Sequence, residues 1–138
     1  MKYIGLDIGS KTIGVASSYG SIASVLTTIR FEHNDLATGL KKLLQQVDFS
    51  QCEKIIIGYP LHLSGDISES SQRVDIFVEH FKKSINVPIQ LVDERYSTLE
   101  ASNLLSELNM NQKKQRKVID QMAAVLILQR YLDTEVKL

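Results

Sequence analysis

The chain has 138 residues, of which 43% are hydrophobic and 23% are charged, and these proportions are ordinary for one globular domain. Lys and Arg together number 16, as do Asp and Glu, so the formal net charge is +0. A protein that binds nucleic acid through its overall charge is basic, so this balance excludes that class and leaves only a local basic patch. The single cysteine, Cys52, excludes an internal disulfide and a Cys-rich zinc site.

Two further features concern location and domain organisation. The N-terminal residues MKYIGLDIGS contain an acid and glycines where a secretion signal has an apolar core. The apolar run AAVLIL near the other end is far shorter than the roughly 20 residues that cross a membrane. We therefore expect a cytoplasmic protein without membrane contact. No Gly/Ser-rich linker divides the chain, so we expect residues 1–138 to form one domain.

Three successive strands are predicted at the start of the chain. Residues 3–8 alternate in polarity, which is typical of a strand with two different faces, Ile4, Leu6 and Ile8 on one and Tyr3, Gly5 and Asp7 on the other. Turn residues at 9–10 and 19–21 separate this strand from two further strands, over 12–17 and 22–31. We expect the three strands to pair antiparallel.

The rest of the chain alternates between helices and strands. Apolar residues at helical spacing within 36–47 predict one helix, and a second helix is predicted to carry Val74, Phe77, Val78 and Phe81 on one face. The apolar runs KIIIGYP and 89–92 predict buried parallel strands. The capping-box pattern at 97–100 predicts a helix, and a last helix is predicted from about Val118 to Leu132, after the polar segment NMNQKKQRK. The sequence therefore predicts an α/β fold with a five-stranded mixed sheet, three antiparallel strands and then two parallel, flanked by helices.

Acidic residues occupy three positions where chemistry is expected. Asp7 ends the first strand, and Asp93 and Glu94 follow the last strand; α/β sheets bind ligands beyond the carboxyl ends of their strands. Asp120, in the final helix, shares a face with two alanines, and a carboxylate buried there needs a partner. A divalent cation, Mg²⁺ or Mn²⁺, resolves the repulsion among such carboxylates, and paired cations of this kind promote phosphodiester cleavage.

Each acid also has a purely structural interpretation. Asp7 could initiate the turn before Gly9, and Asp93 and Glu94 could form an exposed strand end that pairs with Arg95. Asp120 could lie in the first turn of the final helix, where acids favour the helix dipole. The coincidence of the three positions carries more information than any one of them.

Five segments of the sequence resemble one known family. These are GLDIGSKTIGVA, IIIGYPLHLSG, SQRVDIFVEHF, VDERYSTLEA and VIDQMAAVLILQRYLD. Together, and in this order, they are similar to the YqgF-type proteins, which are Holliday-junction-resolvase-like members of the ribonuclease H superfamily and are described as nucleases of the 16S ribosomal RNA precursor. The resemblance extends from near the first residue to Asp133. It implies a ribonuclease H-like fold.

The resemblance also implies which acids are catalytic. Asp7, Glu94 and Asp120 match the acids that bind the metal and catalyse cleavage, and Asp93 is a weaker match. Resolvases place their second acid after the fourth strand, but here that strand ends in GYP, so the role passes to Glu94. The chain departs from the family pattern at Thr12, where an arginine is commoner, and at Ser18, where an acid is commoner.

Candidate nucleic-acid-binding residues surround these acids. We expect phosphate contacts from a basic cluster just before Asp120, which consists of Lys113, Lys114, Arg116 and Lys117. Three further residues are expected to contact phosphates: Lys11, Arg73 and Arg95. The basic cluster could equally be a solvated loop. Arg95 is the best single candidate, because a guanidinium next to Glu94 suits either a phosphate or a carboxylate partner.

Four functions are compatible with these residues. The first is a metal-dependent endonuclease that matures the 5' end of 16S ribosomal RNA. The second is a Holliday junction resolvase acting on branched DNA, which needs a symmetric dimer. The third is a non-catalytic RNA-binding factor in ribosome assembly. The fourth follows from the similarity of GLDIGSKTIGVA to the phosphate-binding hairpin of actin-like ATPases, but those proteins duplicate the domain. We expect a monomer or a weak homodimer whose partner is nucleic acid.

Overall fold

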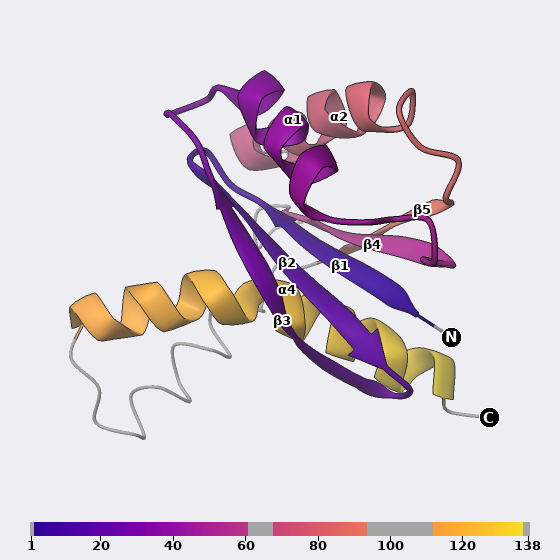
Figure 1. The fold of residues 1–138 in the computed structure, drawn as a ribbon. Coiled ribbons are helices and arrows are strands. Elements are labelled where there is room, and N and C mark those ends of the chain that lie inside the picture. Colours follow the sequence, from indigo (N-terminus) through magenta and orange to yellow (C-terminus); the bar gives the residue numbers. More distant parts are fainter. Residues whose placement is uncertain (1, 61–67, 94–111, 137–138) are drawn as a thin grey trace.

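A mixed sheet with helices on both faces makes up the molecule (Figure 1). The computed structural model describes residues 2–60, 68–93 and 112–136, with the backbone alone for 112–121 and 135–136. Within these residues the strands are β1 (Tyr3–Ile8), β2 (Thr12–Tyr19), β3 (Ile22–Arg30), β4 (Lys54–Tyr59) and β5 (Ile89–Asp93). The helices are α1 (Leu36–Gln46), α2 (Glu69–Phe81) and α4 (Gln112–Val136).

The sheet has the strand order β3-β2-β1-β4-β5. β1 and β2 pair antiparallel, as do β2 and β3, whereas β4 pairs parallel with both β1 and β5. Three antiparallel strands followed by two parallel ones were predicted, and this topology is confirmed. Because β1, β4 and β5 run parallel, their carboxyl ends meet at one end of the sheet.

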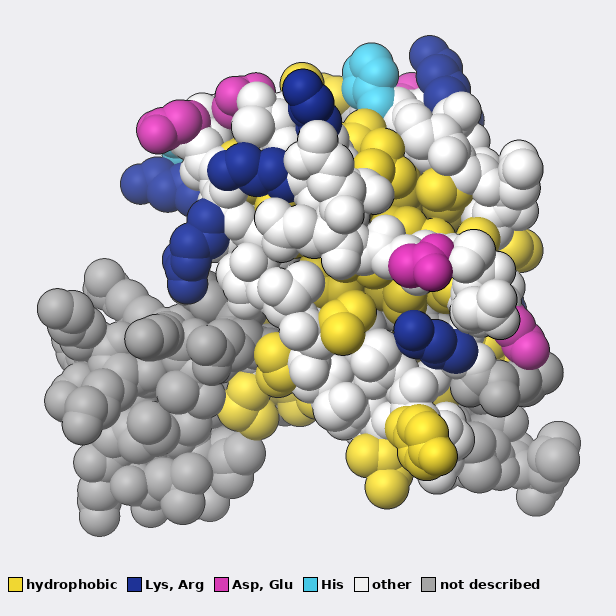
Figure 2. Space-filling view, viewed as in Figure 1, with side chains coloured by type: hydrophobic (Ala, Val, Ile, Leu, Met, Phe, Trp, Pro, Cys, Tyr) yellow, Lys and Arg dark blue, Asp and Glu magenta, His cyan; other side chains and the backbone are white. Residues whose placement is uncertain are grey.

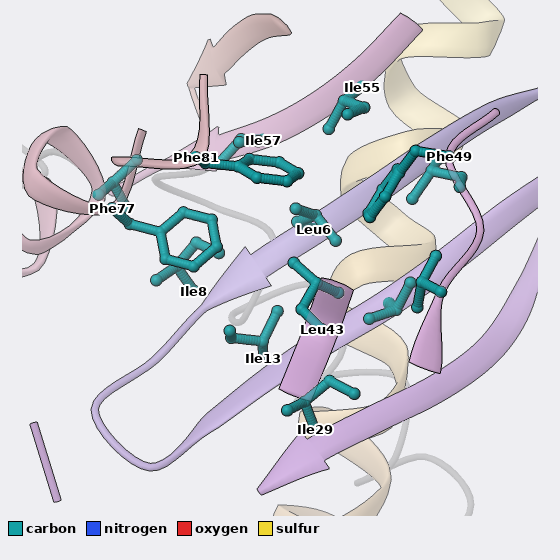
Figure 3. Close-up of a cluster of buried hydrophobic side chains, with 14 of the residues drawn as sticks. Leu6, Ile8, Ile13, Ile29, Leu43, Phe49, Ile55, Ile57, Phe77 and Phe81 are labelled. Atoms are coloured by element: carbon teal, nitrogen blue, oxygen red, sulfur yellow. The ribbon is translucent and has the colours of Figure 1, made fainter. Parts of the chain in front are cut away.

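The two faces of the sheet carry separate hydrophobic clusters. Helices α1 and α2 cover one face, and α4 covers the other (Figure 1). The larger cluster lies under α1 and α2, where the strand residues Leu6, Ile13 and Ile57 pack around the aromatic rings of Phe77 and Phe81 (Figure 3). The predicted alternation of β1 is confirmed, because Ile4, Leu6 and Ile8 all belong to this cluster.

The structure defines the starts of two helices, and one of them differs from its predicted position. α2 begins at Glu69, because Ser68 caps it: the Ser68 hydroxyl accepts from the backbone N–H of Ser71, and the Ser71 hydroxyl accepts from the backbone N–H of Ser68. α4 begins at Gln112, six residues before the predicted start at Val118. The Lys, Gln and Arg residues of this stretch are good helix formers, so polarity there did not interrupt the helix. The helix predicted from Ser97 lies outside the described residues.

Side chains of α4 form hydrogen bonds to the sheet on either side of the central strand β1. On one side, the amide of Gln129 donates to the carbonyl of Ser21 (2.9 Å) and accepts from the N–H of Ala23 (2.9 Å), at the outer edge of β3. On the other side, the hydroxyl of Tyr131 accepts a hydrogen bond from Lys54 of β4 (2.8 Å). The Gln129 amide thus stands where the backbone of a sixth strand would pair. The orientation of α4 over the sheet follows from these contacts.

Gln129→Ala is expected to lower the free energy of unfolding by about 1 kcal/mol, because two hydrogen bonds to partly solvated backbone groups are lost. The variant also uncovers the edge of β3, next to exposed hydrophobic side chains that gather over β3 and the β2–β3 turn (Figure 2). Urea denaturation measures the stability, with the exposed Gln45→Ala in α1 as the control. Equal stability of the two variants would show that the Gln129 bonds contribute nothing.

Candidate active site

Asp7 lies in the last part of β1 and on the face of the sheet that α4 covers. The assignment of its face rests on Gly5, two residues earlier, because side chains two apart in a strand share a face. α4 packs directly on Gly5: a Cβ there would lie 2.8 Å from Cβ of Leu128 and 3.1 Å from the carbonyl oxygen of Ala124. Asp7 is half-buried and therefore both held by the sheet and reachable from outside.

Glycines flank Asp7 on both neighbouring strands. Asp7 pairs with Gly14 of β2, and Gly58 of β4 follows Ile57, the partner of Leu6. The two strand positions level with Asp7 therefore carry no side chain. Sequence analysis did not single out these two glycines, although glycine inside a strand is a known signal for close approach of a ligand or backbone.

The second predicted acid, Glu94, lies outside the described residues, but the residue before it is placed. Asp93 is the last residue of β5 and pairs with Tyr59 of β4. Val92 pairs with Gly58, so the end of β5 is level with Asp7 across the sheet. The structure therefore brings the strand that leads into Glu94 to the same end of the sheet as Asp7.

Asp120 is the ninth residue of α4. One structural interpretation placed it in the first turn of the final helix, and this was wrong, because the helix begins at Gln112 and its first turn ends well before residue 120. The side chain of Asp120 lies outside the described part of the structure. Among the described side chains no group of three His, Cys, Asp or Glu residues could hold a metal ion.

Lys11 stands in the turn between β1 and β2, at the same end of the sheet as Asp7. The turn is tight, since the N–H of Gly9 donates to the carbonyl of Thr12 (2.8 Å). The segment between β3 and α1 supports it from behind: Phe31 N–H donates to the Lys11 carbonyl (2.9 Å). The Lys11 side chain is exposed, so its ammonium is available to a ligand at this end of the sheet.

Arg73 lies on the other face of the sheet from Asp7. It lines a groove of about 740 Å³ between α1 and α2, together with residues that include Asp35, Glu69 and His80. The structure therefore separates Arg73 from the face that carries Asp7. The four basic residues at 113–117 belong to the first two turns of α4, so they are not a loop. Arg95 lies outside the described residues.

Two other residues near the strand ends have structural partners. The hydroxyl of Tyr59 donates to Asp75 of α2 (2.9 Å), and this hydrogen bond to a carboxylate raises the pKa of Tyr59, with burial adding to the effect. Ser18, where the family pattern more often has an acid, lies at the opposite end of the sheet from Asp7. Its hydroxyl accepts from the N–H of Tyr3 (2.8 Å). The departure at Ser18 is therefore remote from Asp7.

The family model and similar curated relatives agree on the family of this chain. A family model described as "RuvX: Holliday junction resolvase" matches residues 1–134. A relative from Oceanobacillus iheyensis is 44% identical over 135 residues, covering 96% of this chain and 98% of the relative. A relative from Thermoanaerobacter pseudethanolicus is 42% identical over 138 residues, covering 98% of each chain. Both relatives carry the name "Putative pre-16S rRNA nuclease".

Solved structures agree on the fold. RuvC of Thermus thermophilus superposes with a TM-score of 0.58 at 12% identity, covering 98% of this chain and 96% of that one. The fowlpox virus resolvase, solved with Holliday junction DNA, gives a TM-score of 0.58 at 10% identity, covering 99% and 100%. The predicted ribonuclease H-like fold is thereby confirmed. Since the family model and these relatives match nearly the whole length, the chain belongs to the RuvX family of Holliday-junction-resolvase-like nucleases.

Proposed function

We propose that this protein is a metal-dependent endonuclease that matures the 5' end of the 16S ribosomal RNA precursor in the cytoplasm. The observation that carries the proposal is the alignment of β1 with α4. Moving along β1, the ring of Tyr3 meets the ring of Tyr131, with centroids 5.9 Å apart, and Gly5 then meets Leu128 and Ala124. As β1 runs toward its carboxyl end, the residues of α4 that it contacts come progressively earlier in the helix.

Continuing this alignment by one step leads from Gly5 to Asp7 and from Ala124 to Asp120. Asp7 is two residues beyond Gly5, or about 6.7 Å along the strand. Asp120 is four residues before Ala124, or about 6 Å along the helix. The nearly equal steps support a pairing of the two acids. Glu94, the residue after Asp93 at the end of β5, is proposed as the third acid.

A divalent cation fits the chemistry of this donor set. Asp7, Glu94 and Asp120 offer carboxylate oxygens only, which are the ligands that Mg²⁺ and Mn²⁺ prefer. Asp7 stands on a central strand between two glycine neighbours, which gives a rigid carboxylate with room beside it. We propose that these three acids hold the cation. When bound, the cation supplies the Lewis acidity that phosphodiester hydrolysis needs.

The other residues of the site would bind and orient the substrate. Lys11, in its supported turn, is proposed to contact a phosphate next to the scissile bond. The basic residues in the first two turns of α4 extend that contact along the strand, through charge and without reading the base sequence. Gly14 and Gly58 let the sugar-phosphate backbone approach the sheet closely at Asp7. Holding the reacting phosphate in one orientation is the chain's own contribution to the rate.

A second candidate function is a DNA junction resolvase, which the description of the family model favours. A cleavage assay on two substrates separates the candidates. One substrate is an RNA that carries the 5' precursor segment of 16S ribosomal RNA, and the other is a four-way DNA junction. Each is incubated with the protein and Mg²⁺, or with EDTA in place of Mg²⁺.

We expect cleavage of the RNA with Mg²⁺, an intact RNA with EDTA, and an intact DNA junction throughout. Cutting of the junction with the RNA left intact would replace the proposal by the resolvase function. Equal cleavage with EDTA would contradict the metal requirement. If the protein binds the RNA and cuts neither substrate, the chain is an RNA-binding assembly factor and the proposal is wrong.

A further inference from the structure

A narrow groove runs between β5 and α4 on the face of the sheet that carries Asp7. Its volume is about 250 Å³, and its lining combines apolar and polar side chains: Gln90, Val92, Asp93, Ile127, Arg130, Tyr131 and Thr134. It extends from Asp93, at the carboxyl end of β5, back to Gln90, a distance of about 10 Å along the strand. The groove therefore starts at the end of the sheet where the acids are proposed to meet.

Arg130 is the cation of this lining. Its side chain is exposed, and among the described residues its guanidinium makes neither an ion pair nor a hydrogen bond. The nearest acid along the helix, Asp133, accepts a hydrogen bond from Gln129 instead (2.9 Å). A guanidinium that lines a groove without a carboxylate partner is well suited to bind a phosphate, since its planar fork matches phosphate oxygens.

Two polar side chains that line the groove, Gln90 and Tyr131, are held by Lys54 of β4. The ammonium of Lys54 donates to the Tyr131 hydroxyl (2.8 Å) and to the side-chain oxygen of Gln90 (3.3 Å), and both partners line the groove. These contacts fix the polar wall in place, so the wall needs little rearrangement when a ligand binds. At about 250 Å³ the groove is small for a drug-sized ligand, and a single strand presents less bulk to it than a duplex does.

We propose that this groove binds one strand of the RNA substrate a short distance from the cleavage site, with Arg130 contacting a backbone phosphate. The inference rests on the proposed function for the identity of the RNA, and it adds a substrate-binding site beyond the acids and the basic residues of the hairpin turn and α4. Arg130 lines the groove on the α4 side, and we infer that it takes the phosphate that leads away from the cleavage site.

The test measures binding of a single-stranded RNA from the 5' precursor segment by fluorescence anisotropy, at several salt concentrations. EDTA is present so that cleavage does not disturb the equilibrium. Each phosphate contact on a single strand contributes about 0.7 to the slope of log K against log salt. We expect Arg130→Gln to reduce that slope by about 0.7 and to weaken binding about fivefold at moderate salt. Arg130→Lys is expected to restore most of the slope.

The matched control is Lys83→Gln, which removes one exposed positive charge beyond the end of α2, away from the groove. If Arg130→Gln and Lys83→Gln change the slope equally, the groove is not an RNA site and the inference is overturned. That result leaves the proposed nuclease function intact, because cleavage with Mg²⁺ is measured separately. Conversely, a wild-type protein that never cleaves the RNA but shows the Arg130 effect would lose the nuclease proposal and keep the groove.

Discussion

Asp7→Asn is expected to lower cleavage of the RNA substrate by at least about a hundredfold, since even the loss of a residue that only supports a metal ligand costs 10–100-fold. An amide oxygen is a weaker ligand for a hard cation than a carboxylate and carries no charge. The fold should survive, because Asn is close to Asp in size and the residue is only half-buried.

Single-turnover cleavage rates over a range of Mg²⁺ concentrations measure this effect. The matched control is Glu53→Gln, the same carboxylate-to-amide change at an exposed residue just before β4, at the opposite end of the sheet. The control should cleave at the wild-type rate. An Asp7→Asn protein that retains full activity would show that Asp7 is a turn residue and that the cation site lies elsewhere.

Gly5→Ala is expected to have the second largest effect, through the position of α4. The added methyl would lie 2.8 Å from Cβ of Leu128 and 3.1 Å from the carbonyl oxygen of Ala124, so the helix must move outward. Overpacking of this kind typically costs 1–3 kcal/mol, and we expect about 2 kcal/mol here. Because α4 carries Asp120, the same movement would shift that part of the helix relative to β1, and on our proposal it would draw Asp120 away from Asp7.

The activity of Gly5→Ala therefore separates a positioning effect from a loss of stability. We expect the Mg²⁺ concentration for half-maximal cleavage to rise at least about fivefold, as supporting changes around a metal weaken its binding. Gly39→Ala is the matched control, because its methyl would meet the ring of Phe31 at 2.8 Å on the other face of the sheet. Rates are compared per folded molecule, from denaturation curves.

Comparison of the two glycine variants tests whether the position of α4 sets the Mg²⁺ requirement. If Gly39→Ala shifts the Mg²⁺ requirement as much as Gly5→Ala does, the requirement reports stability alone. If neither variant shifts it, the contact of α4 with Gly5 does not set the distance between the acids, and the alignment argument for Asp120 is wrong.

Local periodicity was enough to place Asp7 on the correct face. The period-two alternation of residues 3–8 separates Gly5 and Asp7 from Leu6, and the structure confirms this separation in two distinct hydrophobic clusters. The turn signal at Gly9 marked the end of β1 for a similar reason. Both features depend on neighbours in the chain, and such features are readable from composition and spacing.

Helix α4 shows where local patterns were insufficient. Its polar first turns resemble a loop, but Lys, Gln and Arg extend a helix readily, so its start at Gln112 and the position of Asp120 within it were not predictable from polarity. Its contact with Gly5 and the Gln129 bonds to β3 join residues more than 100 positions apart.

The sequence by itself thus determined the order of the strands along the chain, the face of Asp7 and, through its resemblance, the family. Only the tertiary structure decided which residue of α4 is level with which residue of β1, that two glycines flank Asp7, and that Arg130 lines a groove beside β5. The reason is physical: strand alternation is fixed by backbone geometry within a few residues, whereas the placement of a helix on a sheet depends on side chains that meet only after the chain has folded.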